Sequence, residues 1–200
     1  MADLRYCDER GDDGFSWIVD ERMTRTSHAL AAGGNVWLVD PVDWPDAIDR
    51  ARSLGEPAGV LQLLDRHNRD CKAIAGRLGV PHLVAPDGVP QSPFECIPVL
   101  RRKRWAETAL WWPERRTLVV AEAVGTGAFF TGGKAPVGVQ LVLRLFPPER
   151  LATYEPEHLL VGHGEGLHGP GTAHALREAV RTSRRGLPGL LLRLPLAWRS

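Results

Sequence analysis

Side chains that can ligate metals or exchange protons concentrate in one short loop of the sequence. Arg66, His67, Asn68, Asp70 and Cys71 follow directly after the apolar run GVLQLLD. Imidazole, carboxylate and thiolate groups are the usual transition-metal ligands in proteins. In α/β folds, ligands bind beyond the carboxyl ends of the strands. We therefore expect this loop to line a site.

Two further candidates stand where other apolar runs end. Asp40 closes NVWLVDP, and His163 lies in a glycine-rich turn after HLLVG. Simple structural explanations compete with a functional one: Asp40 is also a typical turn residue, and Asp70 a helix-capping carboxylate. Similarly, His163 can form a hydrogen bond to the backbone of the turn in which it lies, and Cys71 is small enough to pack in the core.

The elements that must position these residues can be read from apolar periodicity and breaker residues. The segments 35–41 and 59–65 are predicted as buried strands, and VPHLVAP as a third. Between them, WPDAIDRARSLG and NRDCKAIAGRLG have helical spacing of apolar residues and end at glycine. Strands connected through helices favour parallel pairing.

The second half of the chain has a different character. IPVLRR, TALWWP and TLVVAEAV are predicted as strands of an antiparallel or mixed sheet, with PERR as a hairpin turn. A strand from His158 to Gly162 follows, and TAHALREAVRTSRRG is the last helix, stopped by Gly186. Residues 187–200 form an apolar tail, which either packs on the domain or covers a partner.

Composition narrows the class of protein. The 200 residues are 44% hydrophobic, which is enough for one domain spanning 1–200. The 25 basic and 24 acidic residues nearly cancel, so we expect no nucleic acid or membrane partner. The three cysteines form no CxxC pair, and no leader or membrane span is visible. These features predict a soluble, cytoplasmic protein.

Four segments, in this order and spacing, resemble the metallo-β-lactamase superfamily. NVWLVDP is similar to its early strand ending in aspartate, and LLDRHNRDC to the strand and loop of the H-x-H-x-D-H signature. ERRTLVVAEAVGTG and EHLLVGHGEG are similar to its two later site-bearing strands. The resemblance implies an α/β fold of αββα type, in which two mixed β-sheets are flanked by helices and strand-end ligands hold one or two metals.

Laid on residues 66–71, the signature keeps only one of its four ligands, Asp70. Arg66 and Asn68 stand where histidines would, Cys71 replaces the last histidine, and His67 falls on a spacer. The resemblance also aligns Glu122 with the bridging aspartate and His163 with the late histidine. The third signature histidine has no counterpart between residues 101 and 108. The sequence therefore predicts a degenerate site.

Arg66 bears most directly on metal binding, because a guanidinium stays protonated and offers no lone pair. We expect it to pair with Asp70 or Glu122 in place of a metal. The first hypothesis is thus a protein without two-metal hydrolysis or a cofactor. It would bind a small molecule or protein partner in a residual cleft formed by Asp40, Arg66, His67, Asn68 and Cys71.

The alternative is a metal-dependent hydrolase acting on an ester, lactone or phosphodiester. A rebuilt site would hold one zinc, iron or manganese ion through Asp70, Glu122 and His163, which would then be the catalytic residues, with His67 as a possible fourth. A homo-oligomer assembled through the apolar tail and the tryptophans is a third hypothesis.

Overall fold

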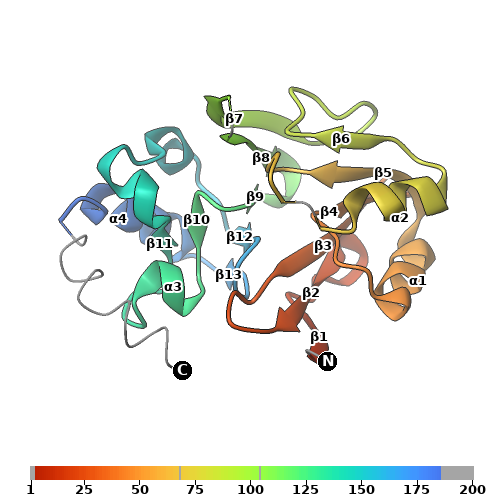
Figure 1. Ribbon diagram of the computed structural model, residues 1–200, viewed down its shortest axis with the longest axis horizontal. Coiled ribbons are helices and arrows are strands. Elements are labelled where there is room, and N and C mark those ends of the chain that lie inside the picture. Colours follow the sequence, from red (N-terminus) through yellow and green to blue (C-terminus); the bar gives the residue numbers. More distant parts are fainter. Residues whose placement is uncertain (1–2, 68, 104, 186–200) are drawn as a thin grey trace.

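The computed structural model describes residues 3–67, 69–103 and 105–185. Its first sheet has six strands in sequence order (Figure 1). The first four pair antiparallel, whereas β4, β5 and β6 run parallel. The strands are β1 (Asp3–Cys7), β2 (Gly14–Asp20), β3 (Thr26–Ala32), β4 (Asn35–Val39), β5 (Glu56–Gln62) and β6 (His82–Val84).

The second sheet has the order β13-β12-β9-β8-β7. Its pairs are antiparallel except for β9 and β12, which are parallel. A short ribbon, β10–β11, stands apart from it. The bounds are β7 (Glu95–Arg102), β8 (Trp105–Trp112), β9 (Thr117–Val120), β10 (Val124–Gly125), β11 (Gly138–Val139), β12 (His158–Val161) and β13 (Leu167–His168).

Helices cover the outer faces of both sheets, with α1 (Pro45–Leu54) and α2 (Cys71–Leu78) on one side and α4 (Thr172–Thr182) on the other (Figure 1). The predicted helix stops are confirmed at Gly55 and at Gly79, which adopts the left-handed conformation. The described residues also form the short helix α3 (Ala128–Thr131) and the 3₁₀ helices η1 (Gly11–Asp13), η2 (Pro113–Arg115), η3 (Leu141–Leu145) and η4 (Glu149–Thr153).

Strand periodicity separates the apolar residues into three packed layers. On β4, Val36 and Leu38 pack under α1 and α2, whereas Trp37 and Val39 point the other way, into the space between the sheets. Leu160 of β12 meets them there, and its neighbours on that strand pack towards α4. The predicted αββα architecture with two mixed sheets is therefore confirmed.

Backbone hydrogen bonds join the two sheets at two points. Arg25 pairs with His163 in one isolated bridge, and Leu64 pairs with Glu107 in another. The Thr26 amide also donates to the Gly162 carbonyl at 2.9 Å. Each bridge contains or adjoins a residue of the candidate site, so the site lies where the sheets are tied together.

Gly186, predicted to stop the last helix, and the apolar tail 187–200 lie outside the described residues. Among the residues that are described, no helix combines the length and the apolar character needed to span a membrane.

Replacing Leu160 by alanine should reduce the free energy of unfolding by about 2–5 kcal/mol, because it leaves a cavity in the layer between the sheets. Urea denaturation measures the change. Val142→Ala is the matched control, since Val142 is 60% exposed and should shift stability by less than about 0.5 kcal/mol. Equal effects of the two substitutions would contradict the layer assignment.

Candidate metal centre

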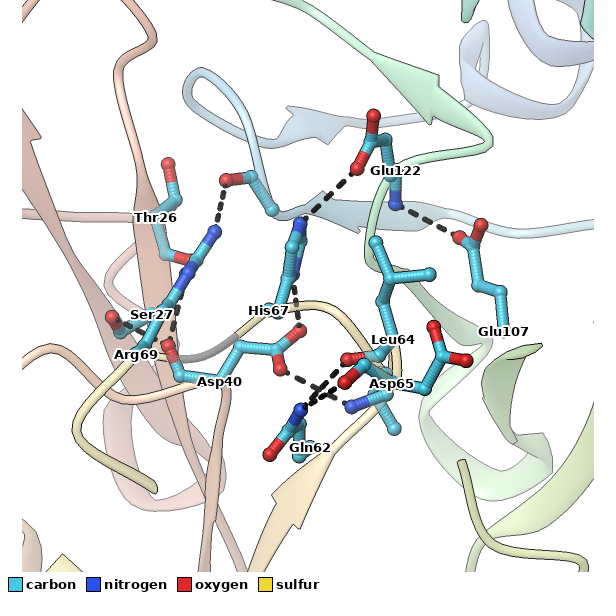
Figure 2. Close-up of polar contacts among 12 residues, drawn as sticks. Thr26, Ser27, Asp40, Gln62, Leu64, Asp65, His67, Arg69, Glu107 and Glu122 are labelled. Carbon is cyan, nitrogen blue, oxygen red and sulfur yellow. Dashed lines mark hydrogen bonds and ion pairs between the residues drawn. The ribbon is translucent and has the colours of Figure 1, made fainter. Parts of the chain in front are cut away.

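His67 stands between two carboxylates in the loop that follows β5 (Figure 2). Its Nδ1 lies 3.3 Å from Asp40 Oδ2, and its Nε2 lies 3.4 Å from Glu122 Oε2. Only 10% of the His67 side chain is exposed. Both ring nitrogens are thus directed at acidic groups, and the orientation of the imidazole is fixed.

Asp40 lies beneath His67 at the end of β4 and is almost fully buried. Its φ of 44° is in the left-handed region, which aspartate tolerates better than most residues. One carboxylate oxygen accepts the Leu63 amide at 3.2 Å, and the other faces His67. Asp40 therefore holds His67 rather than facing solvent.

His163 approaches from the second sheet, directly after β12. Its Nδ1 lies 2.8 Å from the Met23 carbonyl oxygen. A carbonyl can only accept, so Nδ1 carries the hydrogen and the Nε2 of the neutral ring has a free lone pair. Phe130 stacks on one face of the ring, and the His67 ring packs edge-on at 5.5 Å between centroids.

Glu122 follows β9, and its backbone is held by a second acid. Oε1 of Glu107, a buried residue on β8, accepts the amides of Glu122 and Ala123 at 2.8 and 2.9 Å (Figure 2). The other Glu107 oxygen is buried without a partner among the described residues. Burial raises the pKa of Glu107 above its ordinary value, which favours a protonated acid here.

Close approach of two strand ends brings His163 and Glu122 together. A Cβ on Gly162 would lie 2.2 Å from the Ala121 carbonyl oxygen, so only glycine fits before His163. Ligand atoms of His67, Glu122 and His163 lie within 4.8 Å of one another. These residues could hold one metal ion, and they form the candidate centre.

The two histidines differ in charge because their surroundings differ. Burial alone would lower the pKa of His67, but Asp40 and Glu122 raise it above its ordinary value. Burial and the Arg69 charge lower the pKa of His163 to about 4. Without a metal, His67 is thus more readily protonated than an ordinary histidine, whereas His163 is neutral at neutral pH.

The two acids next to His67 stay ionised despite their burial. Burial alone would raise the pKa of Asp40 and Glu122, but in both it is outweighed by the hydrogen bond and charge of His67. Arg69 adds to this lowering at Asp40, and His163 and Arg66 add to it at Glu122.

Arg66 lies at the edge of this cluster. Its Nη2 is 3.6 Å from Glu122 Oε1, so the expected ion pair is confirmed for Glu122. The guanidinium also lies over the Trp105 ring at 3.8 Å and is 44% exposed. Water screens much of its charge at that exposure. Arg66 therefore opposes a cation less strongly than a buried arginine would.

Arg69 was not among the residues predicted from sequence, yet it is central to the loop. Its Nη1 donates to the carbonyls of Thr26 and Asp40, and its Nη2 donates to the Gly162 carbonyl at 2.9 Å. These carbonyls belong to β3 and to the ends of β4 and β12. The Arg69 guanidinium therefore ties together three strands that carry the centre (Figure 2).

Other residues of the predicted loop lie elsewhere. The Asp70 carboxylate accepts the Asp43 amide at 2.8 Å and is not part of the trio. Cys71 is buried in the apolar layer under α2, where burial raises the pKa of its thiol to about 12. Asn68 lies outside the described residues.

Shifting the H-x-H-x-D-H signature by one residue fits this placement better. His67 then takes the position of the second histidine, and Asp65 and Asp70 those of the first and last. Arg69 replaces the signature aspartate.

Glu107 is a second residue of the site that was not predicted from the sequence. One feature of the sequence could have indicated it: an acidic residue inside the apolar run WAETALWW needs a buried partner.

Comparison with known proteins shows the fold and no more. VMB-1 is 8% identical with a TM-score of 0.61, covering 92% of this chain and 99% of its own. A metallo-β-lactamase from Pontibacter korlensis is 11% identical with a TM-score of 0.60, and the match covers 90% of this chain and 99% of that protein. DIM-1 metallo-β-lactamase is 13% identical with a TM-score of 0.57, and the match covers 90% of this chain and 98% of that protein. No protein-family model and no curated protein matches the sequence. The chain thus has the metallo-β-lactamase fold.

In metal-free protein the two histidines should titrate on opposite sides of the ordinary histidine pKa of about 6.5. NMR titration should place His67 above it and His163 at about 4. His67 then contributes to the free energy of unfolding below pH 6.5, and this contribution is lost as pH rises through its folded-state pKa. His163 contributes above pH 6.5, and its contribution is lost as pH falls towards 4. The reverse order of titration would contradict the hydrogen bonds described.

Proposed function

We propose that this chain is a single-metal hydrolase whose ion is held by His67, Glu122 and His163. The carrying observation is that His67 Nε2 lies 3.4 Å from Glu122 Oε2 and that ligand atoms of His67, Glu122 and His163 lie within 4.8 Å of one another, while each Nδ1 faces a protein acceptor. Metal-binding histidines nearly always donate their other N–H to a carboxylate or a carbonyl, here Asp40 and Met23. Two histidines with one glutamate are also a known ligand set of catalytic zinc.

The geometry of the donors fits this reading. The 3.4 Å between His67 Nε2 and Glu122 Oε2 is close to the separation of two ligands about 2.0–2.1 Å from one tetrahedral ion. A metal bound here would displace any proton on His67 Nε2. Metal affinity should therefore fall as pH is lowered through the raised pKa of His67.

The rest of the centre would position the reaction. Held by Asp40, His67 cannot turn away, and Glu107 fixes the backbone that presents Glu122. Arg66 stacks on Trp105 beside the Glu122 carboxylate, where its exposed donors can meet an anionic oxygen of a substrate. A divalent ion supplies Lewis-acid activation of a carbonyl or phosphoryl group and of water. An ester, lactone or phosphodiester is the corresponding substrate class.

One observation favours a second candidate, a metal-free protein that binds a ligand at this place. Arg66 and Arg69 already balance the charges of Asp40 and Glu122, and His67 bridges the two acids. In such a network the charges of the two acids are balanced without a metal ion. Metal content separates the two candidates, because the second predicts none.

Protein exposed in turn to zinc, manganese and iron, then desalted, should retain one equivalent of at least one metal by elemental analysis. His67→Ala, Glu122→Ala and His163→Ala should abolish retention, and Asp40→Asn should weaken it about 10–100-fold. Asp70→Asn is the matched control, because this carboxylate of the same loop lies outside the trio.

Activity is measured on a chromogenic ester, a lactone and bis(4-nitrophenyl) phosphate, with and without chelator. Hydrolysis of one substrate class should require the metal and disappear in the His163→Ala variant. Retention of no metal would reject the proposal in favour of the second candidate. Metal lost in Asp70→Asn but kept in His67→Ala would reject the assigned ligands.

A further inference from the structure

A pocket of about 700 Å³ is lined by residues of α3, β11 and α4, none of which belongs to the metal trio. This volume is within the range of small-molecule sites. Its walls are mainly apolar, and its polar lining includes a buried guanidinium, that of Arg144. The lining residues relevant here are Phe130, Val137, Val139, Arg144, Ala175 and Ala179.

Arg144 is the unusual member of this lining, because it is a buried cation without a counter-ion. Its side chain belongs to η3 and the residue is 7% exposed. Nε donates to the Val139 carbonyl at 3.0 Å and Nη2 to the Phe130 carbonyl. Among the described residues, no carboxylate forms an ion pair with it. Burial lowers the pKa of Arg144, and nothing acidic offsets the effect.

The nearest acidic candidate on the pocket wall is already engaged. Glu178 of α4 lines the pocket, but its carboxylate pairs with Arg181 at 2.7 Å. Buried charges in proteins are usually paired or bound to a ligand of opposite charge. The guanidinium of Arg144 is thus available to an anion entering from the pocket, next to apolar walls that would contact the remainder of such a molecule.

The pocket adjoins the candidate metal centre through one aromatic ring. Phe130 lines the pocket and also stacks on His163, with ring centroids 5.5 Å apart and 28° between planes. Its carbonyl is the one that Arg144 holds. A molecule in the pocket would therefore contact the residue that packs against His163.

We propose that this pocket binds an amphipathic carboxylate, with the carboxylate paired to Arg144 and the apolar body against Phe130, Val137 and Val139. Charge selects the head group, and the apolar walls select against small hydrophilic anions. The assignment does not depend on metal binding or hydrolysis at the other centre.

Isothermal titration of the full chain with octanoate tests this site. Octanoate should bind with one equivalent, and its neutral isostere octanamide should bind at least about tenfold more weakly, as expected for a charged hydrogen bond. Butyrate, which keeps the charge but has less apolar surface, should also bind more weakly.

Two substitutions separate charge from shape. Arg144→Gln should remove the preference for octanoate over octanamide, whereas Ala175→Trp should block both by filling the pocket. Arg150→Gln, an exposed arginine on η4, is the control and should change neither. Thermal unfolding verifies that each variant is folded. Absence of octanoate binding, equal binding of octanamide, or unchanged selectivity in Arg144→Gln would overturn the proposal.

Discussion

The guanidinium of Arg69 is the interaction on which the centre depends. The position of the guanidinium is fixed, because it donates hydrogen bonds to carbonyls at the ends of three strands, which belong to two different sheets. Desolvation lowers the pKa of Arg69, and the nearby Asp40 and the carbonyl dipoles that it contacts compensate its charge. Since Arg69 is two residues from His67, the same contacts fix the loop that presents the imidazole.

The carbonyl contacts of Arg69 explain how an arginine can stand next to the candidate metal centre. In the shifted register, Arg69 occupies the position of the signature aspartate and places a fixed positive charge there. That charge would repel a second cation at the same position, whereas the ligand atoms of His67, Glu122 and His163 lie within 4.8 Å of one another. This is the physical reason for proposing one ion rather than two at this centre.

Much of the first-sheet architecture could be predicted from the sequence because its signals are local. Gly55 and Gly79 end the two helices as expected, and the apolar residues Val36–Val39 and Val60–Leu61 lie in the parallel strands β4 and β5. The strands β1, β2 and β3 were missed. Their buried positions include Ser27 and His28, which interrupt the apolar alternation on which strand prediction depends.

The candidate site was predictable only in part, for a related reason. Glu122 and His163 stand at strand ends and could be found from motif spacing. The roles of Arg69 and Glu107 are set by backbone groups distant in sequence, such as Gly162 and Ala123, and no local pattern reports those contacts. His67 and Asp70 are three residues apart in one loop, and no local pattern shows that His67 joins the trio while the Asp70 carboxylate accepts the Asp43 amide.

X-ray absorption spectroscopy of the metal-loaded protein tests the central claim most directly. We expect one metal ion with two imidazole nitrogens and a carboxylate oxygen in its first coordination shell, no sulfur from Cys71, and no second metal within about 4 Å. A sulfur scatterer, a metal–metal vector, or a shell without imidazole would contradict it.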